Sequence, residues 1–265
     1  MKKALTGYVI FISIFFYGCK NESNDESNIN KNKTAEEVDD FESIEAEQNK
    51  DLETGYFYVL APNGLSLRTS DNLTSKRLLT IPYGEKVKQI ATIHTIDFTV
   101  ENIGGSMMEV LYKEEKGYAF SGFLSKFPVS DKEEESKAYA ERLRAIDLKV
   151  SFETKRTEPD FHDGVIELLT LPSTQWHEAF YLAKAKYDIP KSFTFPGHKG
   201  SRKETISQID KKEDVWTSEL NVIRDDQKLQ KITYSWRSEG SGYVVSISYP
   251  NKNYDAEIEY TAYAD

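Results

Sequence analysis

A two-residue alternation of apolar and polar side chains near the C-terminus constrains the fold of this chain more than any other feature. It runs through Ile232, Tyr234 and Trp236, then through Tyr243, Val245, Ile247 and Tyr249, and again through Tyr254, Ala256, Ile258 and Tyr260. Successive side chains of a strand point to opposite faces, so each segment predicts a half-buried β-strand. A fourth segment, VWTSELNVI, precedes them. We therefore predict an antiparallel meander with one apolar and one polar face.

Two segments before the meander have the period of amphipathic helices. The first is SDKEEESKAYAERLRAI, in which Ser130 and Glu133 have the spacing of a capping box, and the second is STQWHEAFYLAKAKYDIP. The segments LKVSFE and GVIELLTL predict strands. Two helices can cover the apolar face of a meander, so residues 131–265 are predicted to form an α+β domain. The sequence of this domain leaves its function open.

The N-terminus has the layout of a secretory signal. Lys2 and Lys3 precede an uncharged, mostly apolar run over residues 4–17, shorter than the roughly 20 apolar residues that a membrane-spanning helix needs. Gly18 then precedes Cys19, the only cysteine among the 265 residues. Cys19 therefore has no disulfide partner within the chain.

The junction of Gly18 and Cys19 resembles the lipobox of bacterial lipoproteins, in which an apolar residue, a spacer and Gly or Ala precede the modified cysteine. Phe16 and Tyr17 are bulkier than the residues usual there. The resemblance implies that residues 1–18 are a lipoprotein signal peptide and that Cys19 is acylated. It also implies a lipid-anchored place in a Gram-negative cell envelope, at the outer membrane, facing the periplasm or the surface. An ordinary signal peptide or a short anchor helix is the alternative.

Residues 19–54 are dominated by acidic side chains. Twelve acidic residues stand against four lysines, a net charge of −8. So few apolar residues cannot offset the entropy of ordering, and we predict a disordered, extended tether. The whole chain carries −10 and residues 1–18 contribute +2, which leaves −4 on residues 55–265. A mildly acidic folded part has no basic footprint for nucleic acid, so no nucleic-acid partner is expected.

Short strand and turn signals follow the tether. Leu65 and Leu67 alternate with Ser66 and Arg68, which is the pattern of a half-buried strand. The pair NG before this strand and the sequence PYGE after the next apolar run are turn signals. The segments MMEVLY and GYAFSGFL predict further strands, separated by the turn KEEKG.

These segments resemble a bacterial SH3 (SH3b) domain. The family pattern is Gly-Leu-Asn-Val-Arg, a polar loop, a short strand, a Pro/Lys-Gly-Glu/Asp turn and Val, followed by Trp-x-x-Val-x-Tyr, Gly-Trp/Tyr-Val and a closing Leu. The matching residues are Gly64, Leu65, Leu67, Arg68, Gly84, Val87, Val110, Tyr112, Gly117, Tyr118 and Leu124. Met107 or Met108 stands where the family has Trp. The resemblance implies that residues 55–128 form an SH3-like barrel that binds cell-wall peptides or proteins and has no catalytic activity of its own.

Closing a barrel removes exposed sheet edges, so ligand binding in such a domain falls to loops and their aromatic residues. The candidate ligand-binding residues are Arg68, Asp71, Tyr83, Tyr118 and Phe123. Each has a structural alternative, because Arg68 can brace the barrel and Tyr118 and Phe123 can belong to its core.

No catalytic constellation is recognisable in the sequence. The four histidines, His94, His162, His177 and His198, lack the spacing of HExxH or of a zinc amidase. The only cysteine lies at the membrane end, which excludes the cysteine peptidase often fused to SH3b domains. The sequence also lacks GxSxG, GxGxxG and Walker motifs. We therefore expect no catalytic residue, no metal site and no cofactor.

The sequence thus predicts a non-enzymatic envelope lipoprotein whose SH3b domain binds a peptidoglycan peptide or an envelope protein. Two alternatives stay open. In the first, the C-terminal domain is a cell-envelope hydrolase or a sugar-binding protein that the SH3b domain targets; a concave pocket lined by histidine or carboxylate groups in residues 131–265 would favour it. In the second, the meander itself is the binding surface of an interaction protein outside the cell.

Overall fold

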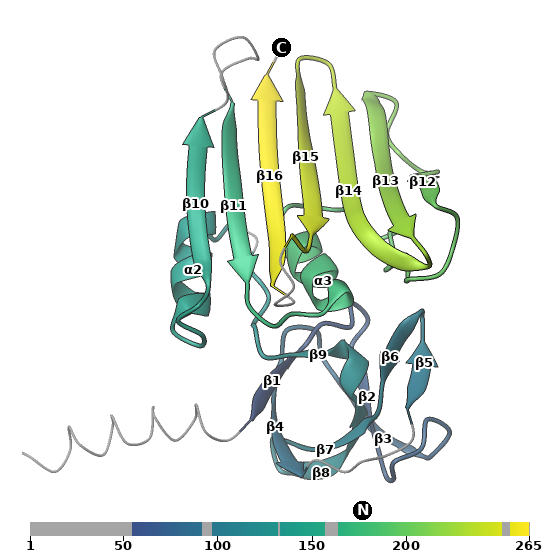
Figure 1. Cartoon of the computed structure of the whole chain (residues 1–265). Helices are drawn as coiled ribbons and strands as arrows, with labels where there is room; N and C mark the ends of the chain where they lie inside the picture. Colours follow the sequence, from purple (N-terminus) through teal and green to yellow (C-terminus); the bar gives the residue numbers. More distant parts are fainter. Residues whose placement is uncertain (1–54, 92–96, 132, 157–163, 251–254, 265) are drawn as a thin grey trace, which may run out of the picture. The chain divides into compact units, whose positions relative to one another are not determined.

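The computed structural model describes residues 55–91, 97–131, 133–156, 164–250 and 255–264 (Figure 1). All of them belong to one compact unit. Antiparallel β-sheets and two α-helices make up this part of the chain, so the predicted β-rich fold is confirmed at this level. The predicted lipidation site Cys19, the predicted tether and the histidines His94 and His162 lie outside the described residues.

Seven short strands form the first sheet, in the order β3-β2-β8-β7-β4-β1-β9. They are β1 (Tyr56–Val59), β2 (Leu65–Arg68), β3 (Arg77–Ile81), β4 (Lys86–Ala91), β7 (Met107–Tyr112), β8 (Glu115–Phe120) and β9 (Leu124–Ser125). Leu65 and Leu67 are buried, whereas Ser66 and Arg68 are only half-buried, as the alternation in this segment predicts. A single 3-10 turn, η1 (Ser121–Phe123), joins β8 to β9.

The strands of the first sheet curl around a common interior (Figure 1), yet their pairing order is open. Within the described residues, no pairing joins the edge strands β3 and β9. Leu67, Ile81, Met107 and Val110 fill the interior, each with no exposed surface. Met107, one of the two methionines that the SH3b resemblance aligns with a Trp, lies in this core.

A small hairpin projects from the first sheet. Its strands are β5 (Phe98–Val100) and β6 (Ile103–Gly105), joined by Glu101 and Asn102 with φ angles of 50° and 65°. Two successive left-handed residues are the mark of a tight type I′ turn. Asn102 at the tip packs against Gly197, where an added Cβ would lie 2.7 Å from the Cβ of Asn102. The hairpin therefore touches the loop that follows the second helix.

The second sheet has the order β10-β11-β16-β15-β14-β13-β12. Its strands are β10 (Ser151–Arg156), β11 (Val165–Leu171), β12 (Lys203–Ser207), β13 (Val215–Asp225), β14 (Lys228–Ser238), β15 (Ser241–Ser248) and β16 (Ala256–Ala264). The last four strands are consecutive antiparallel neighbours, so the predicted meander is confirmed.

Strand register gives the second sheet one apolar and one polar face. Cross-strand partners place Leu169, Ile258, Ile247, Ile232 and Val222 in one row, and none is more than 2% exposed. A polar row on the other face runs through Thr205, Asn221, Thr233, Ser246 and Glu259. The two-residue period that predicted the strands thus also predicts which side of the sheet is covered.

Two helices pack against the second sheet. Helix α2 (Ser136–Arg144) contacts β10, and helix α3 (Trp176–Lys186) contacts β15 and β16. The capping box predicted for Ser130 and Glu133 is wrong, because α2 begins only at Ser136. The Ser130 hydroxyl instead donates to the carboxylate of Glu134 at 3.2 Å. The same carboxylate accepts a hydrogen bond from the Arg142 guanidinium at 2.7 Å.

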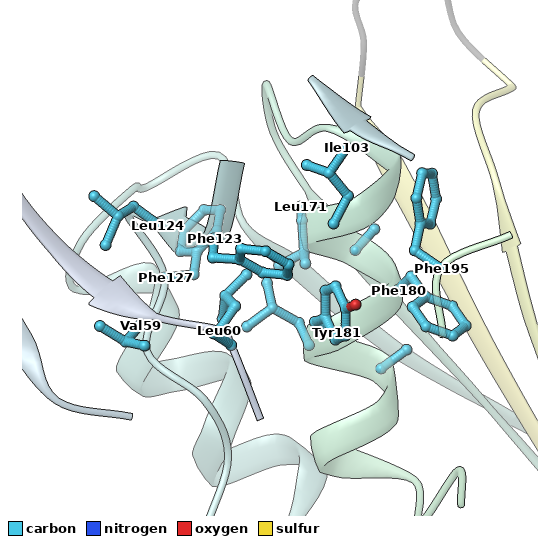
Figure 2. Close-up of a cluster of buried hydrophobic side chains, with 14 of the residues drawn as sticks. Val59, Leu60, Ile103, Phe123, Leu124, Phe127, Leu171, Phe180, Tyr181 and Phe195 are labelled. Carbon is cyan, nitrogen blue, oxygen red and sulfur yellow. The ribbon is translucent and has the colours of Figure 1, made fainter. Parts of the chain in front are cut away.

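Buried side chains of the first sheet and of α3 form one cluster, shown in Figure 2. The ring of Phe123 lies 5.9 Å from that of Phe120 and 5.9 Å from that of Tyr181 on α3. Residues 179–183 are buried without a break, because α3 contacts the second sheet as well as this cluster. A helical segment with apolar side chains on every side is stable when other elements cover every side, as they do for residues 179–183.

Candidate functional site

Arg68 ends strand β2 and holds the loop of residues 69–76. Its Nη1 donates a hydrogen bond to the backbone oxygen of Ser75 at 2.6 Å, and the N–H of Thr69 donates to the oxygen of Lys76 at 3.0 Å. Within the described residues, the guanidinium makes this single hydrogen bond. Arginine carries five N–H donors, so several point away from the protein's own acceptors.

A cavity of about 200 Å³ lies beside this guanidinium, and we term it the loop pocket. Its lining consists of residues 61–66 together with Arg68, Leu73, Val100, Glu101, Met107, Phe120 and Phe123. Two of the five candidate ligand-binding residues, Arg68 and Phe123, therefore meet at one cavity. Sequence reasoning missed Glu101, because nothing in the chain order places the β5–β6 hairpin next to the β1–β2 turn.

The loop pocket combines one cationic and one anionic group with an apolar wall. Glu101 is exposed at the hairpin turn, whereas Arg68 is half-buried. Met107 and Phe120 contribute buried apolar surface. The arrangement can hold a small ligand that has a carboxylate, an ammonium group and a short apolar part between them.

The other three candidate residues lie elsewhere. Asp71 is exposed in the loop that Arg68 holds. Tyr83, 40% exposed, lies in the turn between β3 and β4. Tyr118 is half-buried on β8, where it is the cross-strand neighbour of Arg68. None of the three lines the loop pocket.

Phe123 belongs to the core as well as to the pocket wall. It is only 7% exposed, so most of its surface meets Phe120 and Tyr181 instead of solvent. A ligand in the loop pocket would therefore touch a residue that also holds α3 against the first sheet.

A second arginine, Arg224 on β13, organises the loop before β12. It is 1% exposed, and its guanidinium donates to the backbone oxygens of Gly197 (3.3 Å), Ser201 (3.1 Å) and Pro196 (3.0 Å). It also donates to the Glu204 carboxylate at 2.7 Å. Sequence reasoning missed Arg224, because in the pattern of β13 it occupies an ordinary inward position.

His177 and His198 both lie edge-on to the Phe195 ring, at 5.9 Å and 6.1 Å between ring centres. Burial lowers the pKa of His177 to about 4, and the nearby charge of His198 acts in the same direction. Burial also lowers the pKa of the more exposed His198, with a contribution from Arg224. Among the described residues, no group of three or more His, Cys, Asp or Glu side chains is arranged to hold a metal ion.

No family model matches the chain, and comparison with curated proteins and with solved structures finds no similar protein. Neither helix in the described part of the chain combines the length and the hydropathy that crossing a membrane requires.

Proposed function

We propose that this protein is a non-enzymatic binding protein of the bacterial cell envelope, anchored through Cys19, and that it binds a short cell-wall peptide in the loop pocket. In this proposal the first sheet is an SH3-like (SH3b) module. The observation that carries the proposal is the meeting of Arg68, Glu101 and Phe123 around one cavity. Arg68 and Phe123 are also two of the five candidate ligand-binding residues that the sequence indicates.

The chemistry of the loop pocket supports a peptide ligand. Cell-wall peptides are short and carry free carboxylate and ammonium groups. A guanidinium binds a carboxylate through strong charge-assisted hydrogen bonds, and Arg68 has donors available for this. Glu101 can accept from an ammonium group. A cavity of about 200 Å³ lies below the range of roughly 300–1,000 Å³ that drug-sized ligands occupy, so a ligand of dipeptide size fits it best.

The test uses the full chain in a zwitterionic detergent, titrated calorimetrically with D-alanyl-D-alanine as the minimal zwitterionic peptide. We expect Arg68→Gln to weaken binding at least tenfold, because a hydrogen bond to a charged group contributes about 1.5–3 kcal/mol. Arg77→Gln is the matched control. Arg77 is the exposed cross-strand partner of Arg68 and does not line the loop pocket.

An equal loss in the two variants would show that net charge, and not the pocket, attracts the peptide, and would contradict the proposal. An envelope protein is the partner that the SH3b resemblance also implies. If the dipeptide does not bind and a cross-linked envelope protein is lost in Arg68→Gln but kept in Arg77→Gln, the binding site stands and the peptide assignment is wrong.

A further inference from the structure

A second cavity, of about 330 Å³, lies where the start of α3 meets the first sheet. We term it the helix pocket. One wall comes from the first sheet and its hairpin, including Phe57, Gly104, Met108, Ser121 and Leu124. The other wall comes from the entry to α3, with Ser173, Gln175, His177 and Glu178. It has no lining residue in common with the loop pocket, so a ligand can occupy it without touching the residues proposed to bind the peptide.

His177 is the most unusual group in the wall of the helix pocket. Its side chain is buried, at 6% exposure, yet its imidazole makes no hydrogen bond to any of the described residues. The two ring nitrogens are not among the fully enclosed, unpartnered polar atoms of the described residues, so they keep some contact with solvent and can meet a ligand. The lowered pKa keeps the ring neutral at pH 7, so one ring nitrogen donates and the other accepts.

The charges around the helix pocket cancel. Lys126 lines it, but its ammonium is paired with the Asp147 carboxylate at 2.9 Å. Glu178 already occupies the positive end of α3, where its carboxylate accepts from the N–H of Gln175 at 2.9 Å. Burial raises the pKa of Glu178, and the charge of Lys126 is among the opposing influences. Neither an anionic nor a cationic ligand finds an uncompensated partner here.

The remaining wall of the helix pocket is amphiphilic. Phe57, Met108 and Leu124 give apolar surface, and hydroxyl groups come from Ser121 and Ser173. The Ser121 hydroxyl oxygen accepts from the backbone N–H of Ser106 at 3.0 Å, which leaves its proton free to donate. The β5–β6 hairpin approaches the 3-10 turn η1 so closely that an added Cβ at Gly105 would lie 2.7 Å from the backbone nitrogen of Gly122. This glycine contact exposes backbone instead of side chains along part of the wall.

From these features we infer that the helix pocket binds an uncharged sugar ring. A pyranose presents hydroxyl groups that both donate and accept at its edge and C–H groups on its faces. The edge matches His177, Ser121 and Ser173, and the faces match the apolar wall. A volume of about 330 Å³ accommodates one such ring with its substituents. The helix pocket differs from the pocket that would favour the sugar-binding alternative raised by the sequence, because only Ser173, Gln175, His177 and Glu178 of its lining belong to residues 131–265.

The experiment follows the histidine signals of the full, ¹³C-histidine-labelled chain in a non-glycosidic detergent, with N-acetylglucosamine as the probe. We expect the signal of His177 to shift saturably, while that of His198 stays in place. His177→Gln should weaken binding about tenfold, which corresponds to one hydrogen bond of roughly 1.4 kcal/mol. His198→Gln is the matched control, because His198 touches the same Phe195 ring and does not line the helix pocket.

A second variant keeps the test decisive if His177→Gln does not fold. An added Cβ at Gly104 meets no atom within 4 Å, so Gly104→Val adds bulk at the helix pocket without displacing the chain. It should abolish the shift. Chitotriose distinguishes a glycan chain end from a free monosaccharide as the source of the sugar ring. If the ligand is a chain end, chitotriose should bind at least as tightly as N-acetylglucosamine. If the ligand is a free monosaccharide, the helix pocket should exclude chitotriose.

The absence of any shift at saturating N-acetylglucosamine would overturn the inference. Tighter binding of glucuronate or glucosamine than of the uncharged sugar would overturn it as well, because the pocket would then select charge. The peptide titration of the loop pocket is a separate measurement, so either proposal can fail without the other.

Discussion

Arg68 and Arg224 hold corresponding places in the two sheets. Each lies at or next to the end of a strand, and each binds the backbone of a neighbouring loop. Arg68 is half-buried and makes one hydrogen bond within the described residues, whereas Arg224 is 1% exposed and makes four. A cavity lies beside the first guanidinium, and protein oxygens surround the second.

The difference between the two arginines separates a binding role from a structural one. A fully buried guanidinium that uses four of its five donors within the protein gains little from a ligand, and removing it leaves its acceptors unpaired. A guanidinium with spare donors beside a cavity holds its loop weakly and remains able to bind. Fold stability should therefore depend on Arg224, and ligand affinity on Arg68.

The largest expected effect tests whether the two regions belong to one cooperative unit. Phe123→Ala removes the ring between Phe120 and Tyr181, and we expect a loss of about 3–5 kcal/mol in the free energy of unfolding. Urea unfolding followed by circular dichroism measures it. Phe123→Leu, which keeps most of the volume, is the control and should cost less than about 1.5 kcal/mol. A loss below about 1 kcal/mol for the alanine variant would mean that the shared cluster does not join the regions.

The next effect concerns the buried arginine, Arg224. Arg224→Met should lower the free energy of unfolding by about 3 kcal/mol, because the Glu204 carboxylate and three backbone oxygens lose their donor. Arg202→Met, a change at an exposed arginine of the same loop, should stay within about 0.5 kcal/mol. Equal unfolding midpoints and slopes for the two variants would refute the structural role.

Acid should destabilise the protein through His177. Its folded pKa, about 4, lies below its unfolded value near 6.5, so the unfolded chain binds the extra proton between these two pH values. This contribution to stability is complete above pH 6.5 and is lost as the pH falls toward 4, by up to about 3 kcal/mol. Comparing the unfolding free energy of the wild type and of His177→Gln from pH 7 to pH 4 isolates the contribution of His177 to the pH dependence of stability. Parallel pH curves would contradict it.

The smallest effect concerns Asp71. Asp71 is exposed and does not line the loop pocket, so Asp71→Asn should change stability by less than about 0.5 kcal/mol and dipeptide affinity by less than about twofold. Chemical unfolding and the calorimetric titration measure the two quantities. A larger loss of affinity would extend the binding surface from the pocket onto the loop of residues 69–76.

The second sheet was the easier region to predict from sequence. The alternation at Ile232, Ile247 and Ile258 is local, and it fixes both the strands and the buried face. The prediction failed where local pattern and tertiary structure diverge. Leu148 continues the alternation of LKVSFE, yet β10 begins only at Ser151 and Leu148 is 87% exposed.

The candidate sites were predictable only in part. Arg68 was a candidate because it lies in the SH3b pattern, and Phe123 was a candidate because aromatic residues carry ligand binding in such a domain. Glu101 and His177 could not be found in this way, since each reaches its pocket through contacts between segments that are distant in sequence. Burial of α3 on two sides hides His177 among apolar residues, where a sequence pattern gives no sign of a cavity.

The most direct test of the contrast between the two arginines is to measure both quantities on one variant, Arg68→Gln. The account predicts that its affinity for D-alanyl-D-alanine falls at least tenfold, while its free energy of unfolding changes by less than about 1 kcal/mol. A loss of about 3 kcal/mol in stability, matching that of Arg224→Met, with unchanged affinity in the folded fraction would contradict it. Arg68 would then be a structural brace, and the loop pocket would lose its binding role.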